Sequence, residues 1–178
     1  LLIVEGDAEN LLLPAVAAKM GRPLGKNGVS LVNVGHRGLF RYSRIFQRAD
    51  NASMPIPVAL IPDQDIPPNE AKSLVGDRKT EGAFTNAQLD EHLADLKSDS
   101  GGCVRSFPSE KWTLEFDLAR QHSLATLVHQ AIGLAKGAAG KTTAQIKEAA
   151  AAEVTNWQVE SGQSVDDVAV KIYEPLKK

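Results

Sequence analysis

Short, mainly apolar runs alternate with longer segments of helical spacing over the first 107 residues of the chain. The runs that predict strands are residues 1–4, 29–34, 57–61 and 103–107. Each is followed within two residues by Gly or Pro, and residues 1–4 are wholly apolar, as in a strand buried on both faces. The helical segments between them are residues 8–20, 39–49 and 86–97. This alternation predicts an α/β fold with an open parallel sheet flanked by helices.

The first of these helices contains many apolar residues. Those that we predict to face the core are Leu11, Leu12, Ala15, Val16 and Ala18.

The last part of the chain has a different character, because no strand is predicted after residue 107. Helical spacing continues instead through residues 109–122, 123–136, 142–157 and 165–173. Thr142 with Gln145, and Ser164 with Asp167, have the spacing of a capping box at a helix start. We therefore predict a sheet-containing core over residues 1–122 and an additional helical subdomain over residues 123–178.

Composition excludes several kinds of protein. A single cysteine, Cys103, leaves no internal disulfide and no zinc site built from several thiolates. No apolar run is long enough to span a bilayer and no signal peptide is present, so we expect a cytoplasmic protein without membrane contact.

The chain begins without Met on an apparent core strand, so we expect it to be part of a longer protein. The net charge of -2 means that a nucleic-acid partner would need local basic patches or bound cations.

Five acidic residues lie after predicted strands or early in the helix that follows a strand: Glu5, Glu9, Asp63, Asp65 and Glu115. In an open parallel sheet, the carboxyl ends of the strands lie along one edge, so carboxylates from distant parts of the sequence would converge there. Their mutual repulsion would be relieved by a hard divalent cation, and Mg²⁺ prefers oxygen ligands. Five carboxylates exceed what one Mg²⁺ usually takes from a protein. We therefore expect two Mg²⁺ ions, with Mn²⁺ as a substitute.

A simpler explanation exists for some of these acids. An acid in the first turn of a helix complements the helix dipole, which by itself accounts for Glu9 or Glu115 equally well. An Asp after a strand is often a turn residue. Three acids placed directly after buried strands, Glu5, Asp63 and Asp65, are harder to explain as solvated surface.

The motifs around these acids resemble a known family. Val4-Glu5-Gly6 after one strand and the DxD of Asp63-Gln64-Asp65 after another resemble the Toprim domain of topoisomerases, primases and related nucleases. The longer segments resemble the OLD (overcoming lysogenization defect) family of ATP-dependent nucleases: VEGDAENLLLPAVA, VSLVNVGHRGLFRYSRIF, IPVALIPDQD and EKWTLEFDLA. The resemblance covers about the first 120 residues, and the ordered set with TLE is more specific than EGxxE or DxD alone. It implies a Toprim (Rossmann-like) parallel sheet.

The resemblance also implies a function, that of a metal-dependent DNA endonuclease or nickase that hydrolyses phosphodiester bonds by a two-metal mechanism. Family members carry an ABC-type ATPase domain, which would lie upstream of this chain. By motif match the implied metal ligands are Glu5, Glu9, Asp63, Asp65 and Glu115. Thr113 occupies the hydroxyl position of the last motif. The family has a functional lysine near the end of this region, to which either Lys177 or Lys178 would correspond.

Four arginines recur at helical spacing and are candidates for contacts with DNA phosphates: Arg37, Arg41, Arg44 and Arg48. Guanidinium groups bind phosphate oxygens in pairs, although a solvated helix face would have the same pattern.

Two other functions remain open from the residues. A receiver-like regulatory domain would share the alternating sheet and bind Mg²⁺, but it explains neither Glu5 with Glu9 nor the long helical region. A non-catalytic interaction module would leave the acids as ordinary surface.

Overall fold

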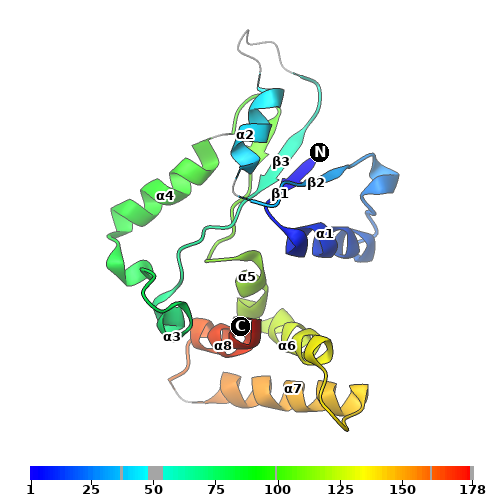
Figure 1. The fold of residues 1–178 in the computed structure, drawn as a ribbon, viewed down its shortest axis with the longest axis vertical. Coiled ribbons are helices and arrows are strands. Elements are labelled where there is room, and N and C mark those ends of the chain that lie inside the picture. Colours follow the sequence, from blue (N-terminus) through cyan, green and yellow to red (C-terminus); the bar gives the residue numbers. More distant parts are fainter. Residues whose placement is uncertain (37, 48–53, 99, 161, 177–178) are drawn as a thin grey trace. The chain divides into compact units, whose positions relative to one another are not determined.

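The computed structural model describes residues 1–36, 38–47, 54–98, 100–160 and 162–176 of the 178-residue chain (Figure 1). The chain forms two compact units. The first unit comprises Leu1–Gln64 and Thr85–Glu110, and the second comprises Asp65–Phe84 and Lys111–Lys178. Each unit therefore contains two separate stretches of sequence.

The first unit contains a parallel sheet of four strands in the order β2-β1-β3-β4 (Figure 1). The strands are β1 (Leu2–Val4), β2 (Leu31–Asn33), β3 (Val58–Ile61) and β4 (Val104–Ser106). In the register, Val4 lies opposite Ile61, so β1 and β3 end side by side in the centre of the sheet. The predicted parallel sheet is confirmed, with each strand somewhat shorter than its apolar run.

Helices cover this sheet in the first unit. Its helical segments are α1 (Asp7–Lys19), η1 (Gly25–Asn27), α2 (Leu39–Ser43), η2 (Arg44–Phe46) and α4 (Asn86–Ser98). Helix α2 contacts β1 and β3, α1 contacts β2, and α4 contacts β4. The buried core is made by Ile3, Leu39, Val58, Leu60 and Val104. Apolar residues from four of the elements therefore meet between the sheet and α2.

The burial of helix α1 differs from the prediction. Leu11 is 75% exposed and Val16 is 41% exposed, and the buried residue of the helix is Glu9. Apolar residues occupy nearly every position from Leu11 to Ala18, so the sequence pattern does not define one inward face. The prediction that these residues face the core was wrong for Leu11, Ala15, Val16 and Ala18, which are exposed, and Leu12 is only half-buried.

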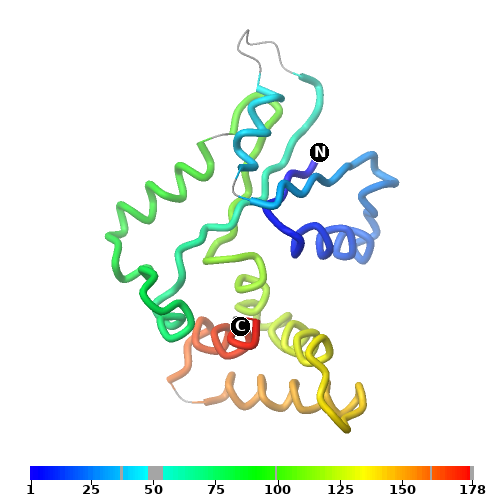
Figure 2. Tube along the Cα trace, in the orientation of Figure 1, coloured from blue at the N-terminus to red at the C-terminus, as the bar shows by residue number. Residues whose placement is uncertain are grey.

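The second unit is helical. Its segments are η3 (Asn69–Ala71), α3 (Lys72–Val75), η4 (Glu81–Ala83), α5 (Leu114–Arg120), α6 (His122–Lys136), α7 (Thr143–Val159), α8 (Val165–Tyr173) and η5 (Glu174–Leu176). Helix α6 packs on α7, and α5 packs on both α6 and α8, as the tube in Figure 2 shows. The rings of Trp112, Phe116 and Tyr173 form a buried cluster between α5 and α8, with centroids 4.8 to 5.9 Å apart. The subdomain boundary at residue 122 stays a prediction.

The helix starts test the capping predictions. The hydroxyl of Thr142 accepts the N–H of Gln145, and that of Ser164 accepts the N–H of Asp167, so both predicted capping boxes are confirmed. The helix expected from residue 109 begins instead at Leu114, because Trp112 has a φ of +25°, which no right-handed helix can include. Within the described ranges, no helix is both long and apolar enough to cross a membrane.

Candidate metal centre

Glu5 and Asp63 meet at the carboxyl end of the sheet. They follow the neighbouring parallel strands β1 and β3, whose last residues, Val4 and Ile61, are in register. The main-chain N–H of Asp63 donates to Oε2 of Glu5 at 2.8 Å. Two acidic residues that are 58 positions apart in sequence are therefore brought together by the order of the strands.

Glu9 lies in the first turn of α1 and is only 4% exposed. Its Oε2 accepts a hydrogen bond from the main-chain N–H of Gly6 at 3.0 Å, and Gly6 is the N-cap residue of α1. A carboxylate buried at a helix N-terminus is stabilised by the helix dipole. Its neighbour Asp7 accepts a hydrogen bond from Nδ2 of Asn33 at 2.7 Å, which ties α1 to the end of β2. Asp7 is thus a further acid at this edge that the sequence analysis did not select.

The residue between the two aspartates of the DxD motif is held at both main-chain groups. The N–H of Gln64 donates to Oγ of Ser109 at 2.8 Å. The carbonyl oxygen of Gln64 lies 2.7 Å from Nε2 of His92, on α4. Sequence reasoning missed both Ser109 and His92, because bonds from distant side chains to a main chain leave no motif.

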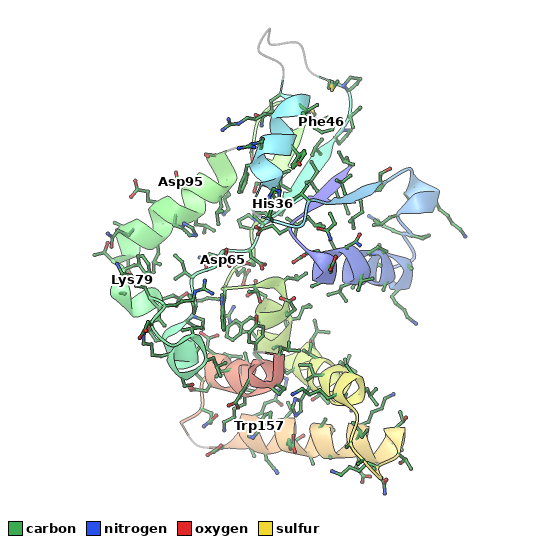
Figure 3. The ribbon with its side chains drawn as sticks, viewed as in Figure 1. His36, Phe46, Asp65, Lys79, Asp95 and Trp157 are labelled. Atoms are coloured by element: carbon green, nitrogen blue, oxygen red, sulfur yellow. The ribbon has the colours of Figure 1, made fainter. Side chains whose placement is uncertain are left out.

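Asp65 and the TLE motif belong to the second unit, and a main-chain hydrogen bond joins Asp65 to Trp112, the residue before the motif. The N–H of Asp65 (labelled in Figure 3) donates to the carbonyl oxygen of Trp112 at 2.8 Å. The carbonyl oxygen of Asp65 accepts Nη2 of Arg78 at 3.0 Å. Asp65 has a φ of +64°, a left-handed conformation that Asp adopts more readily than most residues. Backbone conformations of this kind are concentrated at functional sites.

Thr113 and Glu115 lie directly after Trp112. The Oγ1 of Thr113 accepts the N–H of Phe116 at 3.3 Å, so this hydroxyl caps α5. Glu115 is in the first turn of α5 and is partly exposed. The capping role of Thr113 supplies a structural reason for a hydroxyl residue in this position, beside the metal role implied by the motif.

The structure describes only two of the arginines and lysines that were predicted to contact DNA or phosphate. Arg41 lies in the last turn of α2, Arg44 begins η2, and both are exposed. Arg37, Arg48, Lys177 and Lys178 lie outside the described residues. The predicted helix ends at Ser43 and continues as a short 3-10 helix to Phe46, so Arg41 and Arg44 do not belong to one regular α-helix.

The oxygen atoms at this edge of the sheet are of the type that binds a hard divalent cation. Carboxylate oxygens from Glu5, Glu9 and Asp63 are what Mg²⁺ and Mn²⁺ prefer, and each carboxylate has about four lone-pair positions, so a bond from one N–H leaves room for a metal. The Oε1 of Gln64 is also buried, with no hydrogen-bond partner in the described parts of the chain. As the side chains stand, however, no group of three His, Cys, Asp or Glu residues among those described is arranged to hold a metal ion. Metal binding would therefore require these carboxylates to turn towards a common point.

Comparisons with known proteins bear on this site. Residues 1–65 match the family described as overcoming lysogenization defect protein-like, Toprim domain, and the match includes the first four acids. The fold is similar to the C-terminal region of the Burkholderia pseudomallei OLD protein, with 20% identity and a TM-score of 0.50 over 99% of this chain and 85% of that chain. The C-terminal region of the Xanthomonas campestris pv. campestris OLD protein, phased with platinum, aligns with 21% identity and a TM-score of 0.48, over 97% of this chain and 75% of that chain. No curated protein matches the sequence. Over residues 1–65, therefore, the chain is similar to the Toprim domain of the overcoming lysogenization defect protein-like family.

Proposed function

We propose that this chain is a metal-dependent DNA endonuclease or nickase that hydrolyses phosphodiester bonds. A Toprim domain of this family indicates nuclease-type chemistry and a divalent metal requirement. The observation that carries the proposal is the pairing of Glu5 with Asp63 at the carboxyl ends of the two central strands. Like-charged groups in this position destabilise the chain unless a cation lies between them.

We propose two Mg²⁺ or Mn²⁺ ions as cofactors. The ligands that we propose are Glu5, Glu9, Asp63, Asp65 and Glu115, with Thr113 as a further oxygen donor. Bound there, the ions would make a water more acidic and stabilise negative charge on phosphate oxygens. Support for Glu5, Glu9 and Asp63 comes from their positions in the first unit, whereas Asp65, Thr113 and Glu115 are proposed on the motif match.

The protein groups have separate tasks in this proposal. The main-chain N–H groups of Gly6 and Asp63 orient the carboxylates of Glu9 and Glu5. Arg41 and Arg44 contact the DNA backbone, and Arg37 and Arg48 are proposed to do so from sequence alone. A lysine, Lys177 or Lys178, neutralises part of the charge that develops on the phosphate.

The larger protein is also a proposal. We propose an ABC-type ATPase domain upstream of this chain, as the resemblance of the motifs implies. The fold is similar to a region described as C-terminal in an OLD protein, which supports a further domain before it. We propose that the protein works in the cytoplasm, where its single cysteine would stay reduced.

A plasmid cleavage assay tests the proposal. Supercoiled DNA is incubated with the chain and Mg²⁺, Mn²⁺ or EDTA, and the wild type is compared with Asp63→Asn and Glu5→Gln. We expect nicked and linear products that need a metal and fall at least about 100-fold in either variant. Glu91→Gln, which removes an exposed acid on α4, is the matched control and should cleave like the wild type.

Calorimetric titration with Mn²⁺ then separates the alternatives. Metal binding without cleavage, together with labelling by acetyl phosphate, would favour a receiver-like regulatory domain. A chain that neither binds Mn²⁺ nor cleaves DNA would overturn the proposal in favour of a non-catalytic interaction module.

A further inference from the structure

The chain around Gln64 is held more firmly than a surface loop requires. Three of the four main-chain polar groups of Asp63 and Gln64 have side-chain partners. Glu5 accepts the N–H of Asp63 at 2.8 Å, and Ser109 accepts the N–H of Gln64 at 2.8 Å. His92 lies 2.7 Å from the carbonyl oxygen of Gln64. We infer that His92 is a positioning residue that fixes the DxD loop for metal binding, an inference that rests on the proposed function.

His92 is carried by an element that is itself anchored to the sheet. Helix α4 contacts β4, and Oγ of Ser106 donates to the carbonyl oxygen of Leu96 at 2.6 Å. The N–H of Ser106 donates to Oγ of Ser100, just beyond the end of α4, at 3.0 Å. Leu96 is 7% exposed and lies four residues after His92, so the two side chains share one face of the helix. The imidazole therefore projects from a fixed base towards the loop.

The opposite side of the loop is fixed by an extension of the β3–β4 pairing. The N–H of Phe107 donates to the carbonyl oxygen of Leu60 at 2.8 Å, and the N–H of Ser109 donates to that of Pro62 at 3.1 Å. This pairing brings Oγ of Ser109 to the N–H of Gln64. His92 supplies the remaining anchor, on the carbonyl side of the same residue.

Fixing this main chain matters because the negatively charged carboxylates of Asp63 and Glu5 repel each other. A loose loop would relax by moving the Asp63 carboxylate away from Glu5, and that relaxation would have to be reversed when a cation binds. Removing a residue that orients metal ligands through hydrogen bonds typically lowers metal affinity by about 10- to 100-fold. His92 acts through the main chain of Gln64 and touches no reacting atom.

The direction of the hydrogen bond between His92 and Gln64 determines which substitutions of His92 test its role. A carbonyl oxygen only accepts, so Nε2 of His92 must carry the proton and donate it. Glutamine offers an N–H donor at a similar reach, whereas leucine offers none. His92→Gln should therefore preserve the anchor, and His92→Leu should remove it.

Two measurements on the whole chain test the inference. Amide hydrogen exchange is followed at Asp63 and Gln64 without metal, and Mn²⁺ affinity is measured by calorimetry. We expect His92→Leu to exchange faster at both amides and to bind Mn²⁺ about 10-fold more weakly, with His92→Gln close to the wild type. His122→Leu, at an exposed histidine that begins α6, is the control and should change neither quantity.

The outcomes separate this inference from the proposed function. Unchanged exchange or unchanged Mn²⁺ affinity in His92→Leu would overturn the positioning role, even if the wild type cleaves DNA. A weaker affinity in His92→Leu that His92→Gln fails to restore would also overturn it, because the hydrogen bond would not be the cause. A wild-type chain that binds no Mn²⁺ would overturn the proposed function and the metal part of the inference, and the exchange comparison would still decide whether His92 holds the loop.

Discussion

The N–H of Asp63 donates to Oε2 of Glu5 at 2.8 Å, so the residue that directly follows β1 is bonded to the segment that follows β3. One bond thus places two acids side by side and uses one of them as a structural acceptor. The two contributions of Glu5 have opposite signs in the metal-free chain. Its hydrogen bond stabilises the fold, and its charge beside Asp63 destabilises it.

Variants of Glu5 separate these contributions. Glu5→Gln keeps an oxygen acceptor and removes the charge, so we expect its free energy of unfolding in EDTA to equal or exceed that of the wild type. Glu5→Ala leaves the N–H of Asp63 without this acceptor and should lower the free energy of unfolding by about 1 kcal/mol. Urea unfolding measures both. Added Mn²⁺ should stabilise the wild type only, and equal stabilisation of Glu5→Gln would contradict a ligand role for Glu5.

The left-handed backbone of Asp65, with a φ of +64°, leads to a second prediction. Asn tolerates this conformation nearly as well as Asp, whereas Ala pays a steric cost of about 1 kcal/mol. Asp65→Ala should therefore unfold at a lower urea concentration than Asp65→Asn. Both variants lose the same charge, so the difference between them does not arise from the charge.

Asp65→Gly provides the control for this comparison, because glycine adopts a positive φ without steric cost. Asp65→Gly should not have the steric penalty of Asp65→Ala. Its free energy of unfolding is lowered only by the greater conformational freedom of glycine in the unfolded chain. Equal stabilities of Asp65→Ala and Asp65→Asn would mean that the residue is not left-handed in solution.

The sequence predicted those features that local chemistry determines. The strands were found because short apolar runs end at Gly or Pro, and the caps of α7 and α8 because Thr142 and Ser164 have acceptors three residues on. The burial of α1 was not predictable, since an apolar residue at nearly every position gives no preferred face. In the structure Leu11 is exposed and Glu9 is buried.

The sequence predicted that Glu5 and Asp63 lie close together, but it did not predict the residues that hold the main chain beside them. Glu5 and Asp63 could be placed together because parallel strands end at one edge of a sheet. Ser109 was predicted to start a helix, but its hydroxyl accepts the N–H of Gln64 and the helix starts after Thr113. His92 sits in an ordinary amphipathic helix, and nothing in the pattern around it marks a bond to a main-chain carbonyl 28 residues away.

The aromatic cluster of the second unit gives a third prediction. Phe116 is fully buried, with its ring centroid 5.5 Å from that of Trp112 and 5.9 Å from that of Tyr173. Phe116→Ala should lower the free energy of unfolding by about 3–5 kcal/mol, because it removes a large side chain and leaves a cavity. Thermal and urea unfolding check this.

Leu127 is the matched control in the same unit, since it is 59% exposed on α6. Leu127→Ala should change the free energy of unfolding by no more than about 0.5 kcal/mol. Similar losses in the two variants would contradict the packing of α5 against α8 around Phe116.

The start of α8 gives a fourth prediction, on pH dependence. The main-chain N–H and the hydroxyl of Ser164 both donate to Oδ2 of Asp167, at 2.7 and 2.8 Å. These bonds favour the ionised carboxylate and lower the pKa of Asp167, with the main-chain bond as the largest cause. The unfolded chain has the ordinary pKa of about 3.9. A pKa that is lower in the folded state stabilises the fold above the unfolded value, and this contribution is lost as the pH falls through the folded pKa.

Asp167→Asn should therefore reduce the free energy of unfolding most at about pH 6, and the difference from the wild type should shrink as the pH approaches about 3. Urea unfolding at several pH values measures this difference. In a Ser164→Ala background the effect of Asp167→Asn should be smaller but still present, because the main-chain N–H of residue 164 continues to donate. If the difference between Asp167→Asn and the wild type did not change over this pH range, the carboxylate would not be held by Ser164 in solution. If Ser164→Ala abolished the difference altogether, the hydroxyl rather than the main-chain N–H would be the principal cause of the lowered pKa.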